Sequence, residues 1–275
     1  MQMNYKRVLV KLSGEMLSSK ESTLDREKIL EVAAVLKRFA EEGLQMGVGG
    51  GNIMRGRSAA GMDRTDADHM GMLATVINCL ALKDAICSLG GKAAVLSAIE
   101  MNQVCELFTK RDAVRRLEAG EIVILGAGSG RPYFSTDTAA ALRALEIDAD
   151  ALLCGKACDG IYDKDPRKFP DAKKFDELTY DYIIEHRLEA LDQTAIVLCR
   201  DRPGGGVRVR AFERKKSGRR SLRPGGGDHH SLTVQNGRSH SPFSQNPCAA
   251  QRSCQISPLR RGFETNSLVR RRILH

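Results

Sequence analysis

The chain has 275 residues, of which 42% are hydrophobic, enough for one large α/β domain or two small ones around a buried core. No run of eighteen apolar residues occurs, and the N-terminal segment has no apolar stretch before a small-residue cleavage site. We therefore expect no membrane span, no secretory signal and a cytoplasmic location.

The net charge of +9 is unevenly distributed along the chain. Residues 202–275 hold 16 Lys and Arg against 3 Asp and Glu, which leaves residues 1–201 with 27 basic and 31 acidic side chains. The excess positive charge therefore gives no reason to expect nucleic-acid binding by residues 1–201. No cysteine pair has CxxC spacing and no Cys/His cluster has zinc spacing, so a zinc module is not expected.

Residues 1–201 alternate short apolar runs, typical of buried strands, with amphipathic runs, typical of helices. In chain order, strands are expected at 7–13, 44–48, 92–98, 121–127 and 150–156. Helices are expected after Asp25, after Asp66 or Asp68, at 110–119 and at 136–145. Strands that alternate with helices in this way predict a parallel sheet covered on both faces.

The first two helices carry particular expectations. Asp25 is expected to cap the first helix, and Gly43 stands where a C-cap glycine belongs. The second helix is expected to begin at Asp66 or Asp68. Its buried stripe is expected to consist of Met70, Leu73, Ala74, Ile77 and Ala81.

Glycine-containing loops follow several of the expected strands, where the ligands of parallel α/β sheets bind. They lie at Ser13–Gly14, Gly49–Gly51, Gly126–Gly130 and Gly155. Glycine lets backbone N–H groups approach phosphate oxygens closely, so the joint placement of these loops predicts a phosphate-binding edge. The chain has no GxxxxGK[ST], GxGxxG, HRD or DFG sequence, which excludes a Walker P-loop, a Rossmann fingerprint and a protein kinase.

Several charged residues near these loops have two interpretations. Lys11 and Arg55 suit either phosphate contacts or an ordinary solvated surface. The carboxylates suit either Mg²⁺ or sugar hydroxyls on the one hand, or helix caps and turns on the other. They are Asp68, Asp137, Asp159 and Asp165.

Five sequence strings occur in order: VLVKLSGE, GGGNIMRG, DHMGMLATVIN, GSGRPYFSTDTAA and DGIYDKDP. Together they resemble bacterial UMP kinase, a branch of the amino acid kinase superfamily, from about Tyr5 to Asp201. DHMGMLATVIN is the most specific string, whereas the others are shared in looser form with aspartate, glutamate, carbamate and acetylglutamate kinases. The resemblance implies an α/β fold, a three-layer αβα sandwich with a mainly parallel central sheet, over residues 1–201.

The resemblance also implies an activity, the transfer of the γ-phosphate of ATP to UMP with Mg²⁺, in de novo pyrimidine nucleotide biosynthesis. Lys11 would stabilise the moving phosphoryl group, Arg55 would clamp phosphate, and Asp137 would organise Lys11 and Mg²⁺, which ATP phosphates mainly hold. The implied ATP-binding residues are Lys11, Leu12, Ser13, Gly14, Gly51, Arg55, Lys156, Tyr162 and Asp165. The implied UMP-binding residues are Gly50, Asp68, Ser129, Gly130, Arg131, Pro132, Tyr133, Phe134, Ser135 and Thr136.

The same resemblance implies a homohexamer with GTP and UTP as effectors. Three alternatives stay open: another amino acid kinase that acts on a carboxylate or carbamate, a kinase that no longer turns over, and a non-enzymatic nucleic-acid-binding protein. The last depends on the basic tail alone, for which we expect only non-specific, salt-sensitive binding to polyanions.

The chain departs from the family pattern in three places. The second strand is about two residues short, roughly 7 Å of reach. Ser129 and Arg131 stand where the family has Thr and Asn, so Arg131 adds charge near the base pocket. Residues 202–275 form an aperiodic basic tail, which indicates either disorder or an out-of-frame reading, and only 207–212 keeps a strand pattern.

Overall fold

The computed structural model describes residues 5–49, 61–156, 161–163, 169, 171–175, 177–188, 191–202, 207–213 and 233–235. All of these belong to one compact unit that spans residues 1–238.

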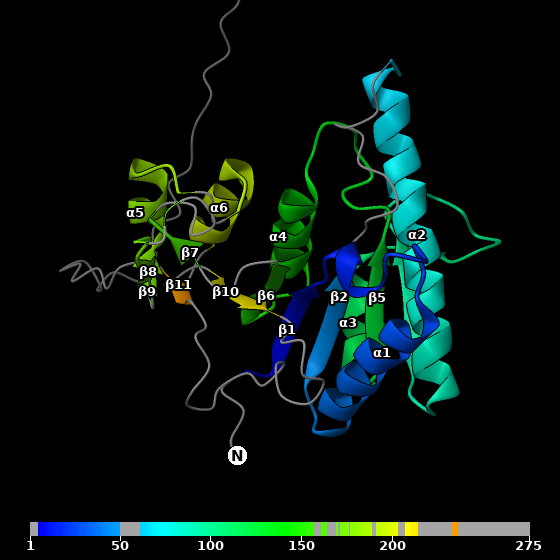
Figure 1. Ribbon diagram of the computed structural model, residues 1–275. Coiled ribbons are helices and arrows are strands. Elements are labelled where there is room, and N and C mark those ends of the chain that lie inside the picture. Colours follow the sequence, from blue (N-terminus) through cyan, green and yellow to red (C-terminus); the bar gives the residue numbers. More distant parts are fainter. Residues whose placement is uncertain are drawn as a thin grey trace, which may run out of the picture. The chain divides into compact units, whose positions relative to one another are not determined.

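Among the described residues, nine strands form the central sheet in the order β4-β3-β5-β2-β1-β6-β10-β11-β9 (Figure 1). The strands are β1 (Arg7–Lys11), β2 (Gln45–Gly49), β3 (Ala93–Ser97), β4 (Glu106–Leu107), β5 (Ile122–Gly126), β6 (Ala151–Lys156), β9 (Glu177–Thr179), β10 (Arg208–Glu213) and β11 (Thr233–Gln235). Every neighbouring pair is parallel except β10 with β11. A separate antiparallel pair joins β7 (Ile161–Tyr162) to β8 (Lys174–Phe175).

The helices cover both faces of this sheet. They are α1 (Arg26–Glu41), α2 (Arg64–Ser88), α3 (Lys110–Glu118), α4 (Thr136–Glu146), α5 (Tyr180–Glu185) and α6 (Gln193–Arg200), with a short 3-10 helix η1 (Gly14–Met16). Successive β1 residues alternate between two cores: Val8 and Val10 pack with α1 and α2, whereas Leu9 packs with α3, α4 and α6. The predicted three-layer αβα sandwich with a mainly parallel sheet is thereby confirmed.

The first helix follows its sequence pattern closely. The carboxylate of Asp25 accepts hydrogen bonds from the N–H groups of Glu27 and Lys28, which caps α1 as predicted. Gly43 has a φ of +88°, a left-handed conformation that glycine adopts without strain, and its N–H bonds to the carbonyl of Ala40.

The second helix differs from its prediction in two ways. It begins earlier, because Asp63 caps it by accepting from the N–H groups of Thr65 and Asp66. Neither Asp66 nor Asp68 is therefore the cap. The predicted buried stripe is also wrong for three residues, since Met70, Leu73 and Ile77 are 44%, 51% and 49% exposed.

The buried residues of α2 lie on a different face of the helix. They are Ala67, Met72, Ala74, Val76, Asn78, Cys79, Leu82, Ala85 and Ile86. Because apolar residues surround most of the helix, their spacing cannot tell which face packs on the sheet. By length and composition alone, α2 is the one described helix that could cross a membrane, but 44% of its most apolar window is buried in the fold, and core helices of soluble proteins meet the same criterion.

The second strand, expected to be short, is completed by the first residue of the glycine triplet. Gly49 ends β2 and stands opposite Lys11 in the parallel ladder, so β1 and β2 finish level with each other. The N–H of Leu12 donates to the carbonyl of Gly49 at 2.7 Å, which continues the pairing. The strand therefore runs one residue beyond the predicted end at residue 48, and the predicted shortening relative to the family stays a prediction.

Two strands lie within the predicted tail. β10 pairs with β6 over six residues, from Arg208 opposite Ala151 to Glu213 opposite Lys156, so the strand predicted at 207–212 is confirmed with a shift of one residue. β11 then connects β10 to β9. The sheet therefore extends beyond residue 201, the predicted end of the kinase domain. Residues 214–232 and 236–275 lie outside the described residues, and the disorder predicted for them stays a prediction.

Candidate active site

The carboxyl ends of four adjacent strands bring the sequence-predicted residues together. β5, β2, β1 and β6 are neighbours in the sheet, and all four are parallel. The carboxyl ends of these strands, at Lys11, Gly49, Gly126 and Lys156, therefore lie at the same edge, which is where an open α/β sheet binds its ligand.

Lys11 and Asp137 form a close ion pair at this edge. The Nζ of Lys11 lies 2.5 Å from the Oδ1 of Asp137, and the two side chains are only 15% and 21% exposed. Asp137 is in the first turn of α4. A negative charge is favourable there because the N–H groups of the first turn have no carbonyl partner within the helix and form the positive end of the helix dipole. Ser135, and not Asp137, caps this helix, so the capping interpretation of Asp137 is wrong.

Asp68 joins α2 to the loop that follows β5. Its Oδ2 accepts a hydrogen bond from the Nε of Arg64 at 2.8 Å and another from the backbone N–H of Tyr133 at 2.8 Å. The guanidinium of Arg64 also lies 5.4 Å from the centre of the Tyr133 ring. The Asp68 carboxylate, in the second turn of α2, thus holds the middle of the predicted UMP loop at Tyr133, a role that differs from the capping interpretation.

The loop 129–136 has a constrained backbone. Gly130 has a φ of +74°, and a Cβ there would lie 2.8 Å from the carbonyl oxygen of Ala98, so a side chain does not fit. Ser129 accepts a hydrogen bond from the N–H of Arg131 at 3.2 Å. Tyr133, with a φ of 70°, and Phe134 leave rings that are 65% and 53% exposed. Arg131 and Thr136 are exposed and Pro132 is half-buried, so this segment exposes polar, aromatic and cationic groups.

On the side assigned to ATP, the described residues have different surroundings. The side chain of Leu12 is buried, and its backbone N–H donates to the carbonyl of Gly49, so Leu12 continues the pairing of β1 with β2. Ser13 precedes η1 and makes no side-chain capping bond, and Gly14 begins η1. Tyr162 lies in β7, opposite Lys174.

Several predicted site residues lie outside the described residues. They are Gly50, Gly51, Arg55 and Asp165, with Asp159. Lys156 ends β6, but its side chain is not among those described. In the described ranges, no group of three or more His, Cys, Asp or Glu side chains converges as a metal site.

Sequence analysis missed two residues that support this edge. Thr75 of α2 accepts the N–H of Ala127 at 2.7 Å and donates to the carbonyl of Met72 at 2.7 Å, which ties α2 to the end of β5. Ala127 has a φ of 60°, an unusual conformation for a residue with a side chain, so this bond helps to hold a strained position. No local pattern marks Thr75, because its partner is 52 residues away.

Asp192 is the second residue that was missed. It caps α6 through the N–H of Ala195, and it also accepts hydrogen bonds from Ser135 and Thr138 at the start of α4. Burial alone would raise the pKa of Asp192, but the bonds from Ser135, Ala195 and Thr138 outweigh it, so the pKa is lowered and the group is a carboxylate. An aspartate before the apolar run TAIVL is a capping signal that would have located it.

A mainly parallel sheet covered by helices on both faces, with a lysine–aspartate pair at its carboxyl edge, defines an α/β protein whose candidate site lies at that edge. The sequence profile of the amino acid kinase family matches residues 6–210, and the chain belongs to this family.

Several individual proteins of known name are similar to this chain. The chain is similar to the uridylate kinase of Methylococcus capsulatus, with 48% identity over 202 residues that cover 72% of this chain and 84% of the relative. Its fold is similar to the crystal structure of UMP kinase from Ureaplasma parvum, with 31% identity, a TM-score of 0.77, and coverage of 85% of this chain and 100% of that one. The UMP kinase of Bacillus anthracis is similar at 31% identity and a TM-score of 0.76, with coverage of 84% and 96%.

A more distant likeness concerns the fold alone. The aspartate kinase of Synechocystis matches with 16% identity and a TM-score of 0.61, over 86% of this chain and 40% of that one.

Proposed function

We propose that this chain is an ATP-dependent UMP kinase, which transfers the γ-phosphate of ATP to UMP and releases UDP and ADP in de novo pyrimidine nucleotide biosynthesis. The observation that carries the proposal is the 48% identity to a uridylate kinase over 84% of that relative's length. The 31% identity to two UMP kinases of known structure supports it.

The described geometry suits this chemistry. The second pKa of a phosphate monoester is about 6, so the UMP phosphate is already an anionic nucleophile at neutral pH and needs no general base. The work left to the protein is positioning and charge neutralisation. Lys11, held at the end of β1 by Asp137, supplies a cation at the strand edge for the moving phosphoryl group. Arg55 is proposed to clamp the phosphates with it.

Mg²⁺ bound through the ATP phosphates would neutralise charge on the transferring group. Asp137 has a carboxylate at the same edge of the sheet and could contribute to such a site. Its bond to Lys11 orients this carboxylate. The ATP side is proposed to include the backbone of Ser13, Gly14 and Gly51, with Lys156, Tyr162 and Asp165 around adenine and ribose.

The UMP side is proposed to lie between α2 and the loop 129–136. Asp68 would accept hydrogen bonds from the ribose hydroxyls, and its existing bonds to Arg64 and to the Tyr133 N–H orient it for that purpose. Gly50, Ser129, Gly130 and Arg131 would contact the uracil and the phosphate. Pro132 to Thr136 would complete the loop.

The alternatives have less support. An amino acid kinase with a carboxylate substrate rests on a likeness to aspartate kinase at 16% identity, which extends to the fold only. A nucleic-acid-binding protein rests on the charge of residues 202–275, most of which lies after the family match that ends at residue 210.

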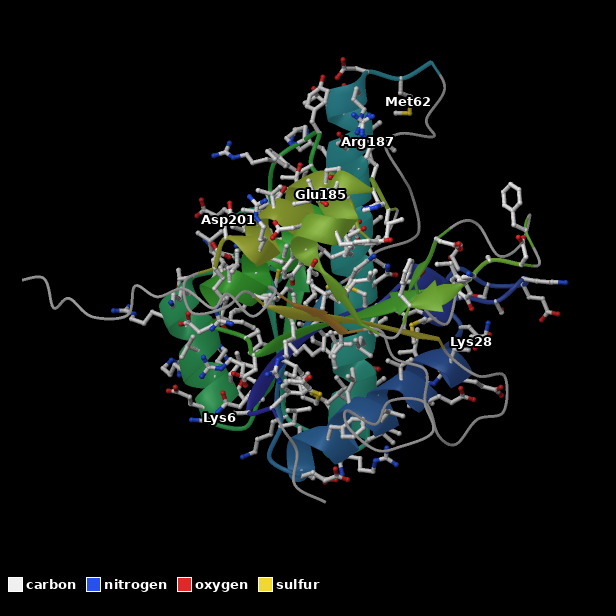
Figure 2. The ribbon with its side chains drawn as sticks, turned by 90° about the vertical axis from the view of Figure 1, so that its left-hand side faces the viewer. Lys6, Lys28, Met62, Glu185, Arg187 and Asp201 are labelled. Atoms are coloured by element: carbon white, nitrogen blue, oxygen red, sulfur yellow. The ribbon has the colours of Figure 1, made fainter. Side chains whose placement is uncertain are left out.

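A homo-oligomer, and specifically a hexamer with GTP and UTP as effectors, is part of the proposal, as is a cytoplasmic location. The exposed face of α2, formed by Met70, Leu73 and Ile77, supports an association between copies, because three large apolar side chains stand on one helix face. Met62, 45% exposed, lies just before α2 and is seen beside its first turn in Figure 2. Sedimentation analysis of Leu73→Glu is expected to show smaller particles than the parent.

The function is tested by coupled ADP release with ATP and Mg²⁺, offering UMP, CMP, aspartate, glutamate and carbamate in turn. Turnover with UMP, and little or none with the others, is the expected result. Turnover with an amino acid and none with UMP would refute the proposal.

A further inference from the structure

One carboxylate joins the N-terminal ends of two helices beside the Lys11–Asp137 pair. Asp192 accepts from the N–H of Ala195 at 2.9 Å, which caps α6. It also accepts from the hydroxyl of Thr138 at 2.9 Å and from the N–H of Thr138 at 3.1 Å. The hydroxyl of Ser135 donates to the same carboxylate.

The groups that Asp192 bonds on α4 lie on both sides of Asp137 in the sequence. Ser135 is the residue that caps α4, and Thr138 follows Asp137 directly. Ser135 and Thr138 are also bonded to each other, through the N–H of Thr138 and the Ser135 hydroxyl at 3.0 Å. The half-buried side chain of Asp192 therefore contacts α4 at its N-cap residue, two positions before Asp137, and at the position directly after Asp137.

The surrounding packing makes this connection rigid. α4 and α6 lie in the same hydrophobic core, where Ala140, Ala141 and Ala144 of one helix and Ala195, Ile196 and Cys199 of the other are buried. Small residues on α4 let the helices approach closely, so their relative position is set by contact as well as by the Asp192 bonds. The two helix N-termini that meet at Asp192 each favour a negative charge.

We propose that Asp192 is a positioning residue for phosphoryl transfer, which fixes the first turn of α4 and so holds Asp137 against Lys11. The inference rests on the proposed kinase function. Asp192 itself is the N-cap residue of α6, and it contacts α4 through the hydroxyls of Ser135 and Thr138 and through the backbone N–H of Thr138.

A capping role alone would give a different outcome, and the chain offers a matched control. Asp25 also caps a helix by accepting two backbone N–H groups, but its helix, α1, carries none of the predicted site residues. Asp25→Ala and Asp192→Ala each remove one capping aspartate. Only the second removes a contact with the helix that carries Asp137.

The expected result is that Asp192→Ala lowers kcat by about 10- to 100-fold, since a displacement of about 1 Å of a catalytic group can cost that much. KM for ATP and for UMP is expected to change by less than about threefold, because the lost interaction acts on the moving phosphoryl group. Asp25→Ala is expected to leave kcat unchanged. Asp192→Asn, which keeps one acceptor oxygen, should lie between Asp192→Ala and the parent.

Hydrogen exchange of the unliganded protein gives a readout that is independent of activity. In Asp192→Ala, the amides of the first turn of α4 are expected to exchange faster, with no change in α1. In Asp25→Ala, the amides of the first turn of α1 are expected to exchange faster, with no change in α4. If the parent does not turn over UMP, the proposed function fails, and this exchange pattern still decides whether Asp192 orders α4.

Two outcomes would overturn the inference: a kcat for Asp192→Ala no lower than that of Asp25→Ala, or unchanged exchange at α4. Should Asp192→Ala not fold, Thr138→Val carries the same test, because it removes the hydroxyl that donates to Asp192 and keeps the side-chain shape. An unchanged kcat in Thr138→Val would then count against the proposal.

Discussion

Charged side chains are used differently on α1 and at the carboxyl edge of the sheet. On α1 they pair four residues apart on an exposed surface, as Lys37 does with Glu41. At the edge, the Lys11–Asp137 pair is less exposed, and its two residues are 126 residues apart in the sequence. Pairs four residues apart follow from helix geometry, whereas the distant pairs require the whole fold. The comparison teaches that the Lys11–Asp137 contact depends on the whole fold, whereas the pairs on α1 depend on one helix.

The largest effect is expected from Lys11→Ala. Loss of one preorganised electrostatic contact to the transition state lowers kcat by about 10²–10³-fold, by analogy with oxyanion-hole donors. KM for UMP is expected to change much less, because Lys11 acts on charge that develops during transfer. Steady-state kinetics of Lys37→Ala provide the control, because Lys37 lies on α1, which carries none of the predicted site residues. A kcat within about twofold of the parent would remove Lys11 from the mechanism.

Asp68→Asn is expected to raise KM for UMP by roughly tenfold or more, the size expected for loss of a charge-assisted hydrogen bond. KM for ATP should stay nearly unchanged. Initial rates with each substrate varied in turn separate the two effects. A rise in KM for ATP alone would place Asp68 on the donor side.

Asp25→Ala changes a cap on α1 and should affect stability only. It is expected to lower the thermal midpoint modestly, because two N–H groups at the helix start lose their acceptor, with kcat unchanged. Thermal unfolding followed by circular dichroism measures the loss. A fall in kcat at a temperature where the variant is fully folded would show that α1 does more than support the sheet.

The smallest effect is expected from Glu41→Ala, which removes the exposed partner of Lys37. Such pairs contribute about 0.3–0.5 kcal/mol, and salt screens them. Denaturant unfolding at low and high salt should show a small difference that disappears at high salt. A loss of several kcal/mol would contradict the contrast drawn between α1 and the site.

The alternation of elements could be predicted from sequence because local patterns determine it. β1 has a run of apolar residues that suits a strand buried on both faces, and Asp25 has the spacing of a cap. The contact between Lys11 and Asp137 followed from family resemblance, since no periodicity links residues so far apart.

The start and the buried face of α2 could not be predicted in the same way. Asp63, Asp66 and Asp68 all have the chemistry of a cap, and only the folded chain shows that Asp63 has that role while Asp68 contacts Tyr133. Exposed Leu73 and Ile77 are as hydrophobic as buried core residues, so the sequence pattern does not distinguish the core face of α2 from its exposed face.

Product identification tests the central claim most directly. The protein is incubated with Mg²⁺, UMP and ATP labelled in its γ-phosphate, and the nucleotides are separated. The account predicts that the label appears in the β-phosphate of UDP, in an amount equal to the ADP formed. Label found only in inorganic phosphate, or in an acyl phosphate when an amino acid is offered in place of UMP, would contradict it.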